Sequence, residues 1–343
     1  MTLYDSNYAT ILPSMAALEH GTSQRKNEAM FRQRLLRWFQ QFQRTLPWRA
    51  ETDPYRILVS EIMLQQTRVA VVEERYRKFV AQFPSVERLA RAREETVMAA
   101  WSGLGYYRRA RALHQAAKEI AGWGAFPATA AELRELPGIG RYTAAAVASI
   151  AFGEPVAVVD GNVKRVLERV THRQAPMQPM AEEDYWHTAG KLLDTRRPGD
   201  FNQAMMELGA LVCLPAQPLC HACPVAGLCS SRGPRERIKG PQRRKAVLQY
   251  ALAQKNGSVL LQQRDRESSL MPGMWELPEI EAQKRSEAPL LTLRHSITTT
   301  DYSVLVFAAA TTTTGRWVPV RTAERLPLTG LTRKILRKLK ADD

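Results

Sequence analysis

The stretch LPGIGRYT at residues 136–143 is the most informative part of the chain, because it predicts two helices joined by a tight glycine turn. Gly138 and Gly140 flank one apolar residue, and glycine adopts positive φ angles without steric cost. Such a turn exposes backbone N–H groups at the start of the second helix, where they bind a phosphate without reading the base sequence. The pattern is typical of a helix-hairpin-helix, and the alternative is an ordinary turn between helices.

Helical periodicity continues on both sides of this turn. Residues 27–230 are predicted to form one mostly α-helical domain, in which only the apolar run 155–159 suggests a strand. Residues 1–26 show no clear period and are expected to form a flexible tail. Ser85 follows a break at Pro84 and is predicted to cap a helix. Further helices are expected over residues 27–42, 55–67, 69–83 and 108–120.

The pattern changes after the helical part. Residues 231–245 hold seven Lys or Arg and two Pro, a composition that predicts a basic linker. Residues 246–343 are predicted to form a smaller α+β domain, in which Asn256 and Gly257 give the signal of a type I′ hairpin turn. Its expected strands cover residues 246–255, 258–263, 290–294 and 302–309, and its closing helix covers 332–340.

Composition narrows the class of partner. The chain has 343 residues, of which 45% are hydrophobic, so it can form two folded domains and is not intrinsically disordered. Its 49 Lys and Arg against 34 Asp and Glu leave a net charge of +15, which indicates a polyanionic partner. Neither a membrane span nor a signal peptide is visible, and no basic amphipathic helix suggests a membrane surface. We therefore expect an intracellular nucleic-acid-binding protein.

Glu61 is the first candidate for acid–base chemistry. It lies in SEIMLQQT at residues 60–67, within an otherwise apolar predicted helix. A carboxyl group in such surroundings has a raised pKa and can act as a general acid. The helical pattern alone favours the alternative, a glutamate on a solvated face.

Asp160 is the second candidate. In PVAVVDGNVKR at residues 155–165 it ends an apolar run and precedes a glycine and a helix, whose dipole favours an ionised carboxylate. It stands some twenty residues after the glycine turn, which favours a functional role. The alternative is that Asp160 only caps the helix.

All four cysteines lie close together, with six, two and five residues between Cys213, Cys220, Cys223 and Cys229. Such a group indicates one metal site in a reducing compartment rather than a disulfide scaffold. Four thiolates can hold a [4Fe–4S] cluster or Zn²⁺. Zinc sites more often show two short Cys-x2-Cys pairs, so the spacing favours the cluster. His221 lies inside this loop and is expected to face solvent.

Together these motifs resemble the endonuclease III superfamily of base-excision DNA glycosylases, and most closely its adenine DNA glycosylases of the MutY type. The C-terminal part resembles the Nudix-like recognition domain of that family. The motifs that carry the resemblance are LPWR at 46–49, SEIMLQQT at 60–67, GLGYY at 103–107, LPGIGRYT at 136–143, VDGNVKR at 159–165, the cysteine loop, MPGMWELP at 271–278 and LTGLTRKI at 328–335.

The resemblance implies a glycosylase that removes adenine paired with 8-oxoguanine or guanine in double-stranded DNA, acting as a monomer in the nucleoid. The adenosine is flipped out of the stack, Glu61 protonates the adenine, and Asp160 stabilises the oxocarbenium-like sugar that remains. Tyr142 lies against the same charge. Bifunctional relatives carry a lysine at this position, which forms a Schiff base. A pyrimidine-lesion glycosylase with lyase activity is therefore the weaker alternative. Lys164, which lies nearby in the sequence, can give incidental trapping without a true lyase step.

Other roles follow from the resemblance as well. Gln66 and Tyr106 match positions that wedge the duplex open, and Gly138 and Gly140 form the phosphate-binding turn. The [4Fe–4S] cluster orders a basic loop against DNA. Positions that match the adenine pocket are Trp48, Arg49, Leu64 and Gln203, although core packing is nearly as good an explanation for Trp48 and Leu64.

The C-terminal part departs from the family pattern in one loop. The family has Phe-Ser-His in this loop. In the stretch RHSITT at residues 294–299, Thr298 keeps a hydroxyl at the serine position, but no histidine follows it. We therefore expect altered discrimination between 8-oxoguanine and guanine. The glutamate cluster of active Nudix hydrolases is absent from residues 246–343, so this domain is expected to bind rather than hydrolyse. A non-catalytic helix-hairpin-helix protein with a structural metal is the remaining alternative.

Overall fold

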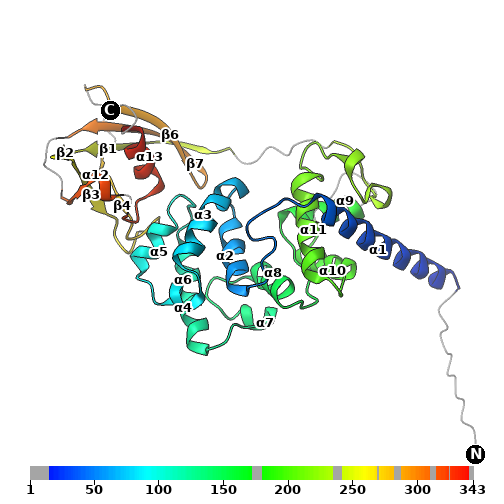
Figure 1. Ribbon diagram of the computed structural model, residues 1–343. Coiled ribbons are helices and arrows are strands. Elements are labelled where there is room, and N and C mark those ends of the chain that lie inside the picture. Colours follow the sequence, from blue (N-terminus) through cyan, green and yellow to red (C-terminus); the bar gives the residue numbers. More distant parts are fainter. Residues whose placement is uncertain are drawn as a thin grey trace, which may run out of the picture. The chain divides into compact units, whose positions relative to one another are not determined.

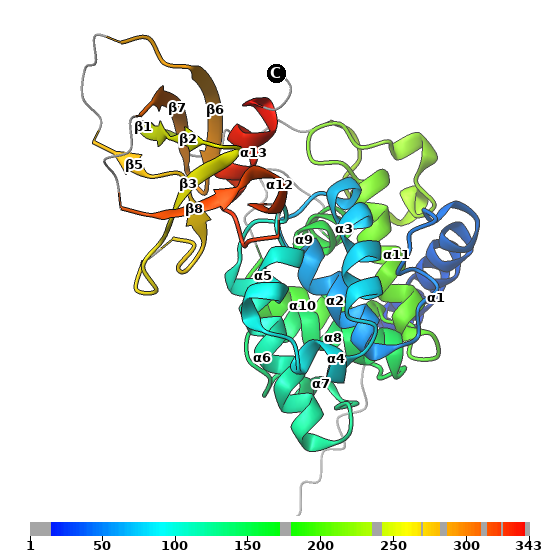
Figure 2. The same ribbon diagram turned by 60° about the vertical axis from the view of Figure 1, so that its left-hand side comes forward.

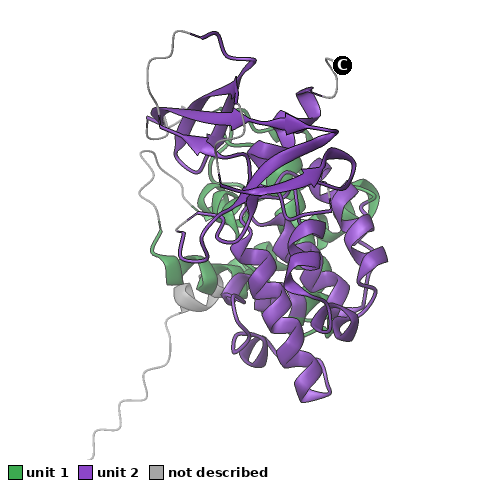
Figure 3. Cartoon of the chain, turned by 90° about the vertical axis from the view of Figure 1, so that its left-hand side faces the viewer, with its two compact units in different colours: residues 1–45, 148–237 green, residues 46–147, 238–343 purple. Residues whose placement is uncertain are grey.

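The computed structural model describes residues 15–171, 180–234, 242–268, 270–281, 287–309, 314–323 and 325–339, with side chains from residue 23. The chain groups into two compact units, which Figure 3 colours separately. Unit 1 contains residues 1–45 and 148–237, and unit 2 contains residues 46–147 and 238–343. Each unit is therefore built from two separate stretches of the sequence.

The helical part of the chain extends from α1 to α11 and ends in two short 3-10 helices (Figure 1). Their bounds are α1 Met15–Phe42, α2 Pro54–Leu64, α3 Val69–Gln82, α4 Val86–Ala90, α5 Glu94–Ala100, α6 Arg108–Trp123, α7 Ala130–Leu133, α8 Arg141–Ala151, α9 Gly161–Thr171, α10 Glu182–Leu192, α11 Pro198–Leu211, η1 Cys220–Ala222 and η2 Ala226–Leu228.

The core of unit 1 is formed by α1, α9, α10 and α11. Phe31 of α1 and Phe201 of α11 are both almost fully buried, and their ring centroids lie 6.5 Å apart. The cysteine loop joins the same core through Val225, which is 1% exposed. The apolar face of each helix therefore faces its neighbours, as amphipathic periodicity requires.

Unit 2 combines helices α2 to α7 and the start of α8 with the whole C-terminal part. Trp101, at the end of α5, is fully buried and packs edge-on against Phe79 of α3, with ring centroids 5.8 Å apart. Ser85 accepts a hydrogen bond from the backbone N of Arg88 and so caps α4, as predicted. Burial of such large aromatic side chains contributes much of the stability of a helical core.

The C-terminal part contains two small sheets and two helices (Figure 2). The first sheet has the order β5-β1-β7-β6, with β1 parallel to β7; the second has the order β2-β3-β4, with β8 also paired to β3. Helix α13 closes the core with Leu331, Ile335 and Leu336. The bounds are β1 Arg244–Leu252, β2 Gln254–Lys255, β3 Ser258–Gln263, β4 Trp275–Glu276, β5 Glu279–Ile280, β6 Leu291–Ile297, β7 Thr300–Ala308, β8 Arg316–Pro319, α12 Val320–Ala323 and α13 Gly330–Leu339.

The expected fold class, a mostly helical N-terminal part followed by a smaller α+β part, is confirmed. Two local expectations are wrong. Helix α1 already begins at Met15, within the predicted tail, because residues 15–26 are mostly good helix formers and contain no proline. Residues 155–159 form no strand. Two of their backbone groups bond the side chain of Asn202 instead, which accepts from the N of Val158 and donates to the carbonyl of Val156.

The predicted hairpin needs a correction as well. Asn256 and Gly257 both have positive φ angles, as a type I′ turn requires, but they join β3 to the short strand β2. Strand β1 belongs to the other sheet. Of the predicted linker at 231–245, residues 235–241 lie outside the described residues, and β1 already begins at Arg244. The predicted domain boundaries stay a prediction.

Among the described residues, a search for a helix of sufficient length and apolar character to cross a bilayer finds no candidate.

Glu276 makes the stability of the C-terminal part dependent on pH. Burial raises the pKa of Glu276 from 4.5 to about 7, although Arg264 lies 2.6 Å from its carboxylate and opposes the shift. Because the folded pKa is the higher one, the stabilising contribution is complete below pH 4.5 and is lost as the pH rises through 7. The quantity to compare is the unfolding free energy of the wild type minus that of Glu276→Gln. We expect this difference to fall by at most about 3 kcal/mol between about pH 5 and about pH 8.

Urea unfolding followed by tryptophan fluorescence measures this difference at each pH. Glu279→Gln serves as the matched control, because Glu279 is exposed and lies on the neighbouring short strand β5. A stability difference that rises with pH would show that attraction to Arg264 outweighs the cost of burial.

Candidate active site

Glu61 is buried in unit 2 with a specific partner. It lies on α2, is 5% exposed and is flanked on the helix by buried Ser60 and Ile62. The hydroxyl of Tyr142 donates a hydrogen bond of 2.6 Å to Oε2 of Glu61. A buried carboxyl group is costly unless it is paired, so this contact accounts for its place in the interior. The alternative of a solvated glutamate is therefore wrong.

The glycine turn sets the position of Tyr142. Gly138 has a φ of +73°, and a Cβ at this position would lie 2.4 Å from the Cβ of Ala112 on α6. A Cβ at Gly140 would meet no atom within 4 Å, and the backbone there needs no positive φ. Helix α8 begins directly afterwards at Arg141, so the positive N-terminal end of its dipole lies at the turn. The predicted hairpin is thus present. Gly138 is required by its positive φ and by the close approach of Ala112, whereas neither reason applies to Gly140.

Thr143 gives a second link between α8 and α2. Gln65, at the C-terminal end of α2, donates a hydrogen bond of 3.1 Å from Nε2 to Oγ1 of Thr143. Two neighbouring residues of α8, Tyr142 and Thr143, therefore both bond to the end of α2. These two contacts together fix the distance between the Tyr142 phenol and the Glu61 carboxyl group.

Asp160 belongs to unit 1 and caps α9. Its Oδ1 accepts a hydrogen bond of 2.7 Å from the N of Val163, and its Oδ2 accepts one of 2.9 Å from Nδ2 of Asn162. Asn202 of α11 holds the preceding chain, bonding the N of Val158 at 3.0 Å. Asp160 therefore does cap the helix, and the same bonds fix the orientation of its carboxylate. Whether it also has a chemical role stays a prediction.

Two arginines of α9 join the Asp160 turn to the cysteine loop within unit 1. Arg165 donates to Oδ1 of Asn162 at 2.8 Å and to the carbonyl of Cys213 at 2.7 Å. Arg169 is 3% exposed and donates to Sγ of Cys213 at 3.2 Å. Donors to a sulfur atom are expected around a thiolate ligand because they stabilise its negative charge.

The four cysteines line one small cavity, together with Arg169 and Arg232. All are free thiols in the structure, and burial raises the pKa of Cys223 to about 11, so a cation is needed to make it a thiolate at neutral pH. In the described part of the chain, no three His, Cys, Asp or Glu side chains are placed to hold a single metal ion. Four cysteines around one cavity are the donor set of a [4Fe–4S] cluster, and four such thiolates can also hold Zn²⁺.

The residues predicted to line an adenine pocket are divided between the units. Trp48 is 6% exposed and packs edge-on against Tyr76, 5.4 Å between ring centroids, which supports a core role. Arg49 follows it in a turn, and Leu64 is the half-buried last residue of α2. Gln203 is buried on α11 in unit 1. Their part in a base pocket stays a prediction.

A cavity of about 730 Å³ in unit 2 brings three predicted DNA-contacting residues together. Gln66, Tyr106 and Thr298 all line it, and all have positive φ angles of +54°, +47° and +49°. Non-glycine residues rarely adopt this conformation, and such strain is concentrated at functional sites. Among the other lining residues, the sequence analysis did not single out Leu270, and it quoted the following ones within motifs without giving them a role: Met271, Pro272, His295, Ser296 and Ile297.

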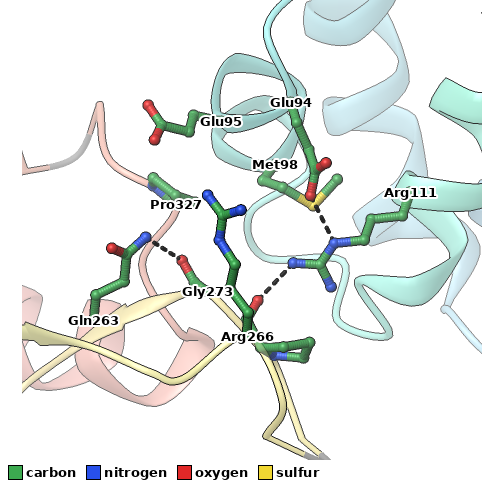
Figure 4. A pocket seen from close by; sticks show the side chains of 9 residues that line it. Glu94, Glu95, Met98, Arg111, Gln263, Arg266, Gly273 and Pro327 are labelled. Atoms are coloured by element: carbon green, nitrogen blue, oxygen red, sulfur yellow. Dashed lines mark hydrogen bonds and ion pairs between the residues drawn. The ribbon is translucent and has the colours of Figure 1, made fainter.

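Arg111 ties the C-terminal part to the helices beside this cavity, as Figure 4 shows. Its Nη2 donates to the carbonyl of Pro272, and its Nε donates to Glu94 at 2.8 Å. These residues line a second cavity of about 370 Å³. Nearby, the hydroxyls of Ser102 and Tyr107 contact the carbonyl of Leu328 at 3.4 and 3.2 Å. Tyr107, Pro272 and Leu328 stand in motifs quoted above, but the sequence pattern indicated none of these contacts.

Comparisons with known proteins agree with this geometry. The family model described as HhH-GPD superfamily base excision DNA repair protein matches residues 59–188. The adenine DNA glycosylase of Homo sapiens is 48% identical over 214 residues, which cover 59% of this chain and 39% of the human protein. That of Arabidopsis thaliana is 37% identical over 311 residues, which cover 77% of this chain and 49% of the plant protein.

A solved thermostable thymine-DNA glycosylase has a TM-score of 0.56 at 30% identity, covering 61% of this chain and 97% of that protein. The chain belongs to the HhH-GPD superfamily of base excision DNA repair proteins. Its expected resemblance to the adenine DNA glycosylases is confirmed by the human and plant relatives. The chain spans less than half the length of those two relatives.

The glycine turn gives a test with a built-in control. Replacing Gly138 by alanine adds a methyl group 2.4 Å from Ala112 in a left-handed backbone, so we expect a loss of at least about 1–2 kcal/mol in unfolding free energy. Gly140→Ala meets no neighbour and should change stability by less than about 1 kcal/mol. Urea unfolding of both variants measures the difference. Equal losses would contradict the close packing of α6 against the turn.

Proposed function

We propose that this protein removes adenine opposite 8-oxoguanine or guanine in double-stranded DNA by hydrolysing the N-glycosidic bond. The observation that carries the proposal is the buried pair of Glu61 and Tyr142, 2.6 Å apart. It supplies a carboxyl group shielded from water, and it places a phenol where a lyase needs an amine. The adenine DNA glycosylases of human and plant support the choice of base.

The proposed chemistry divides the work between the two carboxyl groups. Glu61, in its neutral form, protonates the flipped adenine at N7 and makes it a better leaving group. Departure of the base leaves an oxocarbenium-like sugar, and Asp160 stabilises it as a carboxylate. Asp160 accepts two hydrogen bonds, from Val163 and Asn162, which suits an ionised acceptor. The Tyr142 hydroxyl orients Glu61 and lies beside the developing charge.

DNA binding follows from charge and from backbone geometry. The chain carries a net charge of +15, and the positive N-terminal end of the α8 dipole lies at the glycine turn, where it attracts a phosphate oxygen. Gln66 and Tyr106 are exposed at the mouth of the 730 Å³ cavity, where they wedge the duplex and stabilise the flipped nucleotide. The C-terminal part binds the opposite base without hydrolysing a nucleotide, and Thr298 contacts that base.

Recognition of 8-oxoguanine is expected to be weaker than in the relatives, because the loop at 297–299 has no histidine. The ratio of excision rates on 8-oxoguanine:adenine and guanine:adenine duplexes measures this discrimination.

The four cysteines hold a [4Fe–4S] cluster in this proposal, and the cluster orders the loop after Cys213. The protein should therefore purify brown, with about four irons and four labile sulfides per chain. Cys223→Ala should lose the colour and weaken DNA binding. A colourless protein that holds zinc would remove the cluster from the proposal and leave the glycosylase assignment intact.

Glu61→Gln is the decisive test of the proposed activity. Its amide can still accept the hydrogen bond of Tyr142, so the fold should survive, but no proton is available for adenine. We expect the single-turnover excision rate on 8-oxoguanine:adenine duplexes to fall by about 10²–10⁴-fold. Absent excision by the wild type, or an unchanged rate in the variant, would favour a non-catalytic DNA-binding protein.

Borohydride trapping on abasic DNA distinguishes the proposed glycosylase from the bifunctional lyase alternative, and Lys164→Ala is the matched control. We expect trapping to be weak and to disappear when Lys164 is replaced. Efficient trapping that survives this replacement, together with excision of oxidised pyrimidines, would favour the bifunctional enzyme.

Tyr142→Phe removes only the hydroxyl that contacts Glu61. Glu61 becomes charged as it gives its proton to adenine, and a hydrogen bond to a charged group contributes about 1.5–3 kcal/mol. We therefore expect the excision rate to fall by about ten- to a hundredfold. Affinity for undamaged duplex should stay unchanged, and fluorescence anisotropy measures it. A wild-type excision rate would show that Tyr142 serves only packing.

A further inference from the structure

Arg109, in the first turn of α6, holds two loops of unit 2 together through one guanidinium group. One loop follows α2 and carries Gln66, and the other connects α5 to α6 and carries Tyr106. Nη1 donates to the backbone carbonyls of Ile62 and Met63 at 2.8 and 3.1 Å and to that of Gln65. Nη2 donates to Oγ1 of Thr67 and the carbonyl of Leu104, both at 3.1 Å, and to that of Gly105 at 3.3 Å.

The partners of Arg109 are dipoles rather than acids. In the described part of the chain it has no carboxylate partner, and burial lowers its pKa to about 10. Three of its acceptors are carbonyls at the C-terminal end of α2, where the helix dipole is negative and favours a cation. Only the planar fork of arginine can serve so many acceptors at once, so lysine is no substitute.

Two of these bonds control unusual backbone conformations. The carbonyl of Gln65 belongs to the peptide unit that precedes Gln66, and the carbonyl of Gly105 belongs to the one that precedes Tyr106. The orientation of each peptide unit helps set the φ of the following residue, and both residues have positive φ values, +54° and +47°. A non-glycine residue in this region costs about 1–3 kcal/mol, so an external constraint is needed to maintain it.

The side chain of Tyr106 is held by the same group. The guanidinium carbon of Arg109 lies 5.3 Å from the ring centroid of Tyr106 and 5.7 Å from that of Trp101. Trp101 in turn donates from Nε1 to the carbonyl of Gly105 at 3.1 Å. Tyr106 therefore remains 48% exposed while its ring is fixed from beneath, which preserves a projecting aromatic group at low entropic cost.

We propose that Arg109 is a positioning residue that keeps Gln66 and Tyr106 in a preformed arrangement for insertion into the duplex. The inference rests on the proposed function, because it assumes that these two residues enter a base stack. Arg109 itself touches no reacting atom. It sets the spacing of the two loops in the free protein, so the ordering is complete before DNA binds.

The test compares Arg109→Lys with Arg88→Ala, which removes one positive charge from the exposed surface of α4. The duplexes carry an 8-oxoguanine:adenine mispair with 2-aminopurine beside the adenine. The fluorescence of 2-aminopurine rises when the base unstacks. We expect Arg109→Lys to lower both the fluorescence rise and the single-turnover rate at saturating protein, the latter by about ten- to a hundredfold. Affinity for undamaged duplex should change by less than about twofold, because the charge is kept. Arg88→Ala should match the wild type in rate and unstacking.

A cycle with Tyr106→Ala distinguishes positioning from general damage to the fold. If Arg109 acts through Tyr106, Arg109→Lys should slow excision much less in the Tyr106→Ala background than in the wild type. Equal factors in both backgrounds, or wild-type unstacking by Arg109→Lys, would overturn the inference. If the wild type excises no adenine, the proposed function fails, and the unstacking measurement still decides the role of Arg109.

Discussion

The candidate site in unit 2 depends on the hydrogen bond between Tyr142 and Glu61. A carboxyl group among buried side chains of α2 needs a polar partner, and the phenol supplies it from α8 at 2.6 Å. That distance holds only if the start of α8 lies at a fixed separation from α6. The contact of Gly138 with Ala112 sets this separation, since any larger residue would lift the turn. The glycine turn and the proposed acid are thus parts of one packing arrangement.

Asp160 is positioned by a different principle. The segment before Asp160 bonds the side-chain amide of Asn202. The Asp160 carboxylate accepts hydrogen bonds from the backbone N of Val163 and from the side-chain amide of Asn162. Arg165 then connects the turn to the carbonyl of Cys213. The orientation of this carboxylate is therefore coupled to the order of the cysteine loop, and little of it depends on apolar packing. Directional hydrogen bonds suit a group whose task requires orientation as well as charge.

Features that depend on local chemistry were predictable from the sequence, and those that depend on tertiary contacts were not. The glycine turn, the Ser85 cap and the type I′ turn at Asn256 follow from backbone preferences, and the structure contains them. The burial of Glu61 went against its helical pattern, because Tyr142 lies 81 residues away and only the fold brings it near.

The extended run at 155–159 failed as a strand for a similar reason, since a strand needs a partner that the run itself cannot specify. Arg109 gave no signal at all: it stands among neighbouring arginines in α6, and only the carbonyls around it distinguish it. The motifs located the proposed chemistry, and the contacts that hold it in place required the structure.

The parallel pairing of β1 with β7 has a consequence for how the chain is made. Each residue of β1 pairs with one that lies 56 positions later, Arg244 with Thr300 and Leu252 with Ala308. At about 5–20 residues per second, a ribosome needs roughly 3–11 seconds to synthesise that interval. During this time β1 has emerged with one long hydrogen-bonding edge unsatisfied, the situation in which nascent strands pair with the wrong neighbour. Its first residues, Arg244 and Lys245, are charged and exposed, and such residues discourage association with another chain during synthesis.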